Sequence, residues 1–219
     1  SRAKKGKEWV PKKDWGSFAE RVRKRMPLPS GNQEESQVEW LAGLDYPQEL
    51  DIKNAALRDF WHFKKLPGRP EKIVPSPRPR NYRTTTKRRV VYHDERFCLT
   101  FSDENIVPRV PFSDSSIEPP EHAQLYRFLL EHINLPRYHL LGENLNYLII
   151  RGNYTEFCVI FNMHTVTSLM VKKIKQITEE MKKLPVNLIS VFLYLDPSQS
   201  DYYLESRRPE GIISFKKIF

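Results

Sequence analysis

The spacing between apolar residues changes along the chain, from about four positions in residues 45–66 to about two positions in residues 89–101. Within residues 45–66, four apolar residues form one stripe: Ile52, Ala56, Phe60 and Phe63. Apolar residues three or four positions apart lie on one face of a helix. Asp45 with Gln48 fits a capping box, and Pro47 lies in the first turn, where its missing N–H costs nothing. Residues 45–66 are therefore predicted to form a helix that ends at Leu66-Pro67-Gly68.

Beyond residue 89 the apolar residues alternate with polar ones. Residues 89–101 alternate on both sides of the turn 93–95, a pattern that predicts a hairpin. Residues 105–112 predict an irregular edge strand, because Pro108 and Pro111 cannot donate to a ladder of hydrogen bonds.

Further elements complete one α+β domain. They are a helix from Pro119-Pro120 to Ile133, two strands over residues 145–161 joined at Gly152-Asn153, a helix over 165–184 and a strand over 186–195. We expect residues 44–219 to form a mainly antiparallel sheet with three helices. Residues 1–43 are expected to be a basic, partly irregular N-terminal arm and linker, with a short helix around Ser17 to Arg25.

Charge is distributed in blocks. The chain has 219 residues and a formal charge of +9. Residues 1–25 carry ten lysines and arginines against three acids, and residues 51–89 carry twelve against three. Residues 90–164 reverse this balance, with five against ten. A basic face on a balanced body is typical of polyanion binding, although residues 1–25 alone fit a solvated charge run equally well.

The sequence shows no metal site and no active site. Cys98 and Cys158 are the only cysteines and lie in apolar strand patterns, which argues against a disulfide framework, a zinc site and an iron–sulfur cluster. The turn His93-Asp94-Glu95 carries polar residues that turn geometry alone explains. Three histidines lack the spacing of a metal site: His122, His132 and His139. No glycine-rich loop follows a strand, so we expect no catalytic residue and no cofactor-binding residue in this chain.

Nothing in the sequence predicts a membrane protein. No apolar run reaches the roughly 18 residues of a membrane span, and the N-terminus lacks the apolar region of a secretory signal. We expect a cytoplasmic protein without a membrane partner. The chain begins with Ser1 and stops inside the strand-like pattern of residues 215–219, so we also expect it to be a piece of a longer protein.

Residues 75–92 form the most informative stretch, with six basic residues and no acid. All six are candidates for contact with RNA phosphates: Arg78, Arg80, Arg83, Lys87, Arg88 and Arg89. Tyr82 is a candidate for stacking on an unpaired base. Strand alternation would place Lys87 and Arg89 on one side and Val90 on the other. A basic edge strand protected from aggregation by its charge is the plainer alternative.

These residues resemble a known family. The segment "GLDYPQELDIKNAALRDF…EKIVPSPRPRNYRTTTKRRVVY" is similar to the part of the RNA uracil-5 methyltransferases in which a helix leads through a Ser-Pro turn to a Tyr-Arg strand. The matching residues are Tyr46, Gln48, Leu50, Lys53, Ser76-Pro77 and Tyr82-Arg83. The later runs "ENLNYLIIRGNYTEFCVIFN", "VNLISVFLYLD" and "GIISFKKIF" resemble the central domain of the same family, so the resemblance covers residues 44–219.

The resemblance implies a non-catalytic portion of an enzyme. Family members transfer a methyl group from S-adenosylmethionine to a flipped-out uracil of ribosomal or transfer RNA, through a nucleophilic cysteine in a later domain. This chain carries no cysteine where members with an iron–sulfur cluster have them, and Thr85 stands where the family's strand has a lysine. We therefore expect a monomeric RNA-binding portion with no iron–sulfur cluster and no catalytic residue.

Two alternatives stay open at this point. The first is a stand-alone RNA-binding module, which would have no catalytic partner domain. The second is a protein-interaction domain whose basic arm docks on an acidic partner. Retention of structured RNA in a salt-sensitive manner would argue against the second.

Overall fold

The computed structural model describes residues 16–26, 41–101, 112, 114–199 and 215–219. Contacts between Cα atoms divide these residues into two compact units. The first contains residues 16–26 and 41–77, and the second contains the described residues from 78 onward. The predicted domain boundary at residue 43 stays a prediction.

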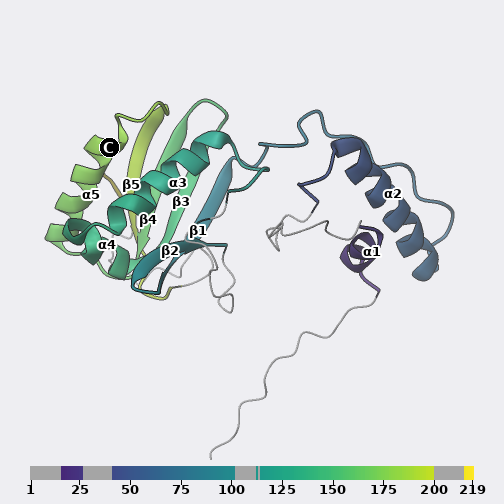
Figure 1. Ribbon diagram of the computed structural model, residues 1–219, viewed down its shortest axis with the longest axis horizontal. Coiled ribbons are helices and arrows are strands. Elements are labelled where there is room, and N and C mark those ends of the chain that lie inside the picture. Colours follow the sequence, from purple (N-terminus) through teal and green to yellow (C-terminus); the bar gives the residue numbers. More distant parts are fainter. Residues whose placement is uncertain (1–15, 27–40, 102–111, 113, 200–214) are drawn as a thin grey trace, which may run out of the picture. The chain divides into compact units, whose positions relative to one another are not determined.

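The first unit is a pair of helices, α1 (Phe18–Arg25) and α2 (Tyr46–Phe63) (Figure 1). Helix α1 begins at Ser17, whose hydroxyl accepts a hydrogen bond from the Glu20 amide at 3.2 Å. Asp45 is the N-cap residue of α2, as predicted, but its side chain accepts no hydrogen bond from a backbone amide, so the expected capping box is wrong. Only two apolar side chains of the unit's described residues are buried, Val22 and Ala56, so this unit has a small core.

A strap of residues 66–77 runs back along α2. The Trp61 indole donates to the Pro67 carbonyl at 2.9 Å, the Ile73 amide donates to Asn54 at 2.8 Å, and the Ser76 amide donates to the Tyr46 hydroxyl at 2.6 Å. These hydrogen bonds follow α2 from its end to its beginning. They fix the strap although most of its side chains are exposed.

The second unit is built on a six-stranded sheet. The strands are β1 (Thr85–His93), β2 (Arg96–Thr100), β3 (Leu145–Gly152), β4 (Phe157–Met163), β5 (Leu188–Leu195) and β6 (Phe215–Lys217), in the order β2-β1-β3-β4-β5-β6. Four neighbouring pairs are antiparallel, and β4 with β5 is parallel. The α+β class is confirmed, but the sheet is mixed, because a helix carries the chain from β4 to β5 in the same direction.

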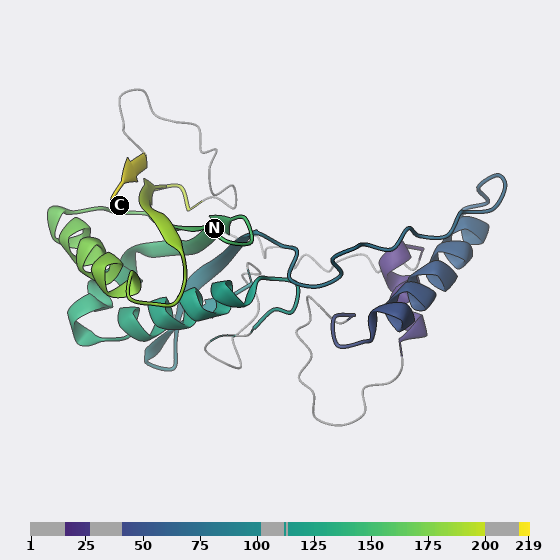
Figure 2. The ribbon, with the colours of Figure 1, turned by 90° about the horizontal axis from the view of Figure 1, so that it is seen from above.

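Three α-helices cover one face of this sheet: α3 (Pro120–Ile133), α4 (His139–Asn144) and α5 (Ser168–Met181) (Figures 1 and 2). A short 3₁₀ helix, Pro136–Tyr138, joins α3 to α4. The main core lies between these helices and the strands, and its central members are fully buried: Leu125, Leu129, Leu148, Val159, Ile174 and Val191. A smaller cluster lies on the other face of the sheet: Tyr147, Ile149, Ile160 and Tyr194.

The described part of residues 44–219 contains four α-helices rather than the three expected, and α1 is the fifth α-helix of the described residues. Helix α1 belongs to the N-terminal arm, where the sequence indicated a short helix. Helix α4 has six residues and was missed, because so short a helix shows no apolar period. The expected edge strand over 105–112 lies outside the described residues except for Phe112.

No helix in the described ranges is both long and apolar enough to cross a bilayer.

Candidate nucleic-acid interface

Strand β1 places its side chains alternately on the two faces of the sheet. Thr86, Arg88 and Val90 are buried on the face that the helices cover. Lys87 and Arg89 point to the other face and are half-buried. The predicted division between Lys87 and Arg89 on one side and Val90 on the other is therefore found in the structure.

Arg88 lies inside the protein. Its guanidinium donates two hydrogen bonds to the Glu118 carboxylate, at 2.8 and 2.7 Å, and also lies 4.0 Å from the centre of the Phe101 ring. The two charged side chains are only 1% and 4% exposed. A guanidinium held this way cannot reach an RNA phosphate, so Arg88 is removed from the candidate contacts. Strand alternation puts Arg88 on the same side as Val90, a signal for its burial that the sequence analysis did not use.

A buried polar network lies next to this ion pair. The Thr86 hydroxyl is 2.9 Å from His122 Nδ1 and 2.9 Å from the Tyr126 hydroxyl, both on α3. Burial, and then the Arg88 charge, lower the pKa of His122 to about 4. Burial raises the pKa of Tyr126. The network is therefore neutral at pH 7, and it fixes the beginning of β1 against α3.

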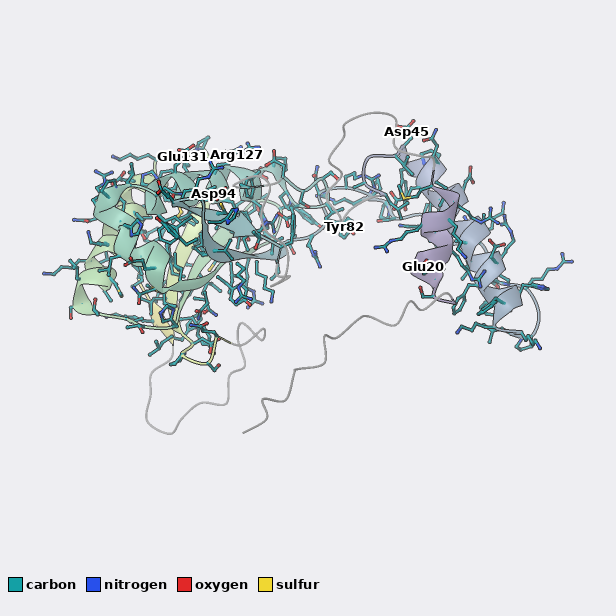
Figure 3. The ribbon with its side chains drawn as sticks, turned by 60° about the horizontal axis from the view of Figure 1, so that its bottom comes forward. Glu20, Asp45, Tyr82, Asp94, Arg127 and Glu131 are labelled. Atoms are coloured by element: carbon teal, nitrogen blue, oxygen red, sulfur yellow. The ribbon has the colours of Figure 1, made fainter. Side chains whose placement is uncertain are left out.

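The remaining basic residues of the stretch are accessible. Arg78 and Arg83 are exposed, and Arg80, Lys87 and Arg89 are half-buried. Tyr82, labelled in Figure 3, lies on the segment before β1 and is 49% exposed. We call these six residues the basic ribbon: Arg78, Arg80, Tyr82, Arg83, Lys87 and Arg89.

The backbone under the ribbon is held in place. The Asn81 amide donates to the Ser116 carbonyl at 3.1 Å, and the Arg83 amide donates to the Ile117 carbonyl at 2.8 Å. From Thr85 onward, β1 lies between β2 and β3 in the sheet. The side chains of Tyr82 and Arg83 are thus exposed on a fixed backbone, which reduces the entropy cost of binding a ligand.

Two residues that the sequence analysis missed lie next to the ribbon. Arg151, at the end of β3, pairs with Thr85 of β1 and is exposed. Tyr154, in the following turn, carries the Arg78 guanidinium 3.7 Å above its ring centre. The signal was the run "IIRGNYTEF", in which an arginine and a tyrosine flank a turn, but pairing with β1 cannot be read from that run.

The described residues contain no group of three or more metal-ligating side chains. His122 contacts Thr86, whereas His132 Nε2 lies 3.0 Å from a Glu180 carboxylate oxygen. His93 and Asp94 lie at the hairpin turn with their polar atoms 3.3 Å apart. The His139 ring centre lies 4.8 Å from that of Phe97, so the three histidines considered as ligands have different partners.

Neither cysteine has the environment of a nucleophile. Burial is the largest cause that raises the pKa of the Cys98 thiol, and the same holds for Cys158. A raised pKa reduces the fraction of reactive thiolate at neutral pH. Burial therefore makes both thiols less reactive as nucleophiles at neutral pH.

Comparisons with known proteins support the fold. No protein-family model matches the chain, and no curated protein matches it. Among solved structures, the chain is similar to the crystal structure of Pyrococcus abyssi tRNA (uracil-54, C5)-methyltransferase in complex with S-adenosyl-L-homocysteine, with 19% sequence identity and a TM-score of 0.52. The match covers 80% of this chain and 40% of that one. At this identity the likeness shows the fold alone, and that fold is related to part of a tRNA uracil-5 methyltransferase.

Proposed function

We propose that this chain is the central, non-catalytic portion of an S-adenosylmethionine-dependent RNA (uracil-5-)-methyltransferase, and that its basic ribbon binds the RNA substrate. Two findings support the proposal. The fold is similar to part of a solved tRNA (uracil-54, C5)-methyltransferase. The ribbon presents accessible cations beside an exposed tyrosine, the combination that binds phosphates and an unpaired base.

The observation that carries the proposal is the direction of the β1 side chains. Alternate residues of a strand are roughly 6.6–6.8 Å apart and point to the same side. Lys87 and Arg89 therefore form one row, while Arg88 is held inside by Glu118. Arg151 extends the accessible cations to the neighbouring strand. A strand that presents cations on one side and anchors itself by the other can hold an RNA backbone in a defined place.

The chain's own residues would bind and orient RNA. S-adenosylmethionine would supply the methyl group in such an enzyme. The residues present do not fit that cofactor, because the sequence has no glycine-rich loop after a strand. No step through the cofactor is therefore assigned to this chain.

The triple variant Arg83→Ala/Lys87→Ala/Arg89→Ala tests the proposal. Removing one cation that neutralises a phosphate makes the slope of log affinity against log salt shallower by about 0.7–0.9. We expect the slope for a transfer RNA transcript to become shallower by about two to three units and the affinity at low salt to fall roughly tenfold or more. Fluorescence anisotropy over a series of salt concentrations measures both quantities.

A matched control removes the same charge elsewhere. The variant Lys172→Ala/Lys175→Ala/Lys183→Ala changes three exposed lysines on and just after α5. We expect it to keep most of the affinity and most of the slope. An equal loss of affinity in both triple variants would mean that net charge alone attracts RNA. Absence of RNA binding by the unsubstituted chain would favour a protein-interaction domain.

A further inference from the structure

An open groove lies on the face of the sheet opposite helices α3, α4 and α5. None of its lining residues belongs to the basic ribbon. Its volume is about 460 Å³, within the range of roughly 300–1,000 Å³ that is usual for small-ligand sites. The groove lies between the β3–β4 turn and strands β5 and β6. Its lining residues include Arg151, Asn153, Glu156, Ile160, Ile189, Phe192 and Phe215.

Flat apolar surfaces form much of the groove. The Phe192 and Phe215 ring centres are 4.9 Å apart and their planes are inclined by 34°. Ile189 is 49% exposed and Phe215 is 36% exposed. Exposed rings beside an aliphatic side chain offer a planar ligand a surface for stacking.

The polar groups of the groove gather at the β3–β4 turn. The Asn153 side-chain oxygen accepts hydrogen bonds from the Thr155 amide at 2.7 Å and from the Glu156 amide at 2.8 Å. The Asn153 amide group donates to the Glu156 carboxylate at 3.0 Å. The turn therefore holds one carboxylate, which accepts N–H groups, beside the cation of Arg151.

The sheet register links this groove to the basic ribbon. Arg151 pairs with Thr85 on β1 and with Cys158 on β4. Thr85 comes two residues after Arg83 of the ribbon and is paired with Arg151, which lines the groove. The ribbon therefore passes the end of the sheet at which the groove opens. Tyr154 of the same turn stacks on Arg78, which brings another ribbon residue to this end.

We propose that the groove binds one unpaired nucleobase of an RNA whose backbone is held by the ribbon. The base stacks on Phe215, its N–H groups face Glu156, and Arg151 binds the adjoining phosphate. This inference rests on the proposed function and extends it from phosphate contacts to a base site. Charge complementarity selects a nucleotide over an acidic peptide, because the groove combines a cation with a hydrogen-bond acceptor and an aromatic wall.

The variant Phe215→Ala tests the base site, and Phe219→Ala is its matched control. Both phenylalanines are 36% exposed and lie in the same C-terminal segment, but Phe219 does not line the groove. Since stacking on an aromatic side chain is worth about 1–3 kcal/mol per base, we expect Phe215→Ala to weaken binding of a single-stranded RNA at least about fivefold. The salt slope should stay unchanged, because a ring releases no counterions. Phe219→Ala should bind normally.

A second measurement needs no substitution in the groove. Methyl spectra of the full chain are recorded by NMR during titration with uridine or guanosine 5′-monophosphate, and with ribose 5-phosphate for comparison. We expect the nucleotides to shift the methyl signals of Ile160 and Ile189, and ribose 5-phosphate to leave them in place. This titration decides the inference if Phe215→Ala fails to fold.

The outcomes separate this inference from the proposed function. RNA binding that depends on the ribbon but is unchanged in Phe215→Ala, with no nucleotide-induced shift at the two isoleucines, would overturn the base site alone. Equal shifts with ribose 5-phosphate would show a phosphate site only and would overturn it too. If the unsubstituted chain bound neither RNA nor mononucleotides, both the base site and the proposed function would fail.

Discussion

At the residue scale, the buried His122 makes stability depend on pH. His122 is 0% exposed, and its pKa is lowered from 6.5 to about 4, first by burial and then by Arg88. Between pH 6.5 and 4, His122 is protonated in the unfolded chain but neutral in the folded chain. Lowering the pH through this range therefore favours unfolding. We expect the His122 contribution to the free energy of unfolding to be constant well above pH 6.5 and to fall by up to about 3 kcal/mol between pH 6.5 and 4. Urea unfolding at several pH values measures it.

The variant His122→Asn separates this effect from other titrations. It removes the imidazole, so the loss of stability between pH 6.5 and 4 should become smaller even if the variant is less stable at pH 7. Glu180 affects a lower range, because hydrogen bonds from His132 and Tyr138 lower its pKa below the ordinary 4.5. An identical pH profile in wild type and His122→Asn would contradict the assignment.

Single residues also show what the sequence could reveal. Alternation correctly grouped Lys87 with Arg89, because the period of a strand is a local property. The partner of Arg88 could not be found in the same way, since Glu118 is 30 positions away and no local pattern links the two. Arg151 was missed for the same reason: it joins the ribbon only through the pairing of β1 with β3.

At the scale of elements, the β3–β4 hairpin holds the groove and the end of the ribbon together. The sequence predicted a tight turn at Gly152-Asn153, but β3 ends at Gly152 and β4 begins at Phe157, so four residues connect them. The Asn153 side chain folds this longer turn through bonds to two backbone amides. The sequence identified Asn153 as a turn residue. It did not show that the Asn153 side chain would accept hydrogen bonds from two backbone amides in a longer turn.

The variant Gly152→Ala tests the hairpin. A Cβ atom at Gly152 would lie 2.1 Å from the Glu156 carbonyl oxygen, so the turn must shift. We expect Gly152→Ala to lower the free energy of unfolding by about 1–3 kcal/mol and to weaken RNA binding, because Arg151 and Tyr154 move with the turn. Thermal and urea unfolding, with anisotropy for RNA, measure the two effects.

Gly43→Ala is the control for this variant. A Cβ atom at Gly43 meets nothing within 4 Å, so stability should change little. Equal losses of stability in the two variants would contradict the assignment to the close approach in the hairpin, because the effect of Gly→Ala on the unfolded chain alone is stabilising.

The length of the apolar pattern in each element explains which elements could be predicted from the sequence. Helices α2, α3 and α5 each carry an apolar stripe long enough to be read from the sequence. The parallel pairing of β4 with β5 was missed, because an apolar run shows that a strand is buried but not which neighbour it pairs with. The sequence therefore predicted the kinds of element better than their arrangement.

At the scale of the whole molecule, the two compact units differ in how many apolar side chains each one buries. Every residue of the two apolar clusters comes from position 90 or later. The first unit buries only Val22 and Ala56 among its described apolar residues. Units with so small a core are marginally stable, whereas a domain of about 140 residues buries enough surface to fold alone. The sheet unit should therefore carry most of the protein's stability.

We expect a chain of residues 78–219 to unfold cooperatively. The midpoint of its thermal transition should lie within about 2 °C of the main transition of the full chain, which corresponds to a difference in stability of roughly 1 kcal/mol or less.

Two variants of the full chain provide the matched comparison. Leu148→Ala should destabilise the main transition by about 2–5 kcal/mol, because Leu148 is fully buried in the sheet core. Val22→Ala should leave that transition in place and increase hydrogen exchange in α1 and α2 only. A lower midpoint for residues 78–219, or for Val22→Ala, would show that the helical unit stabilises the sheet.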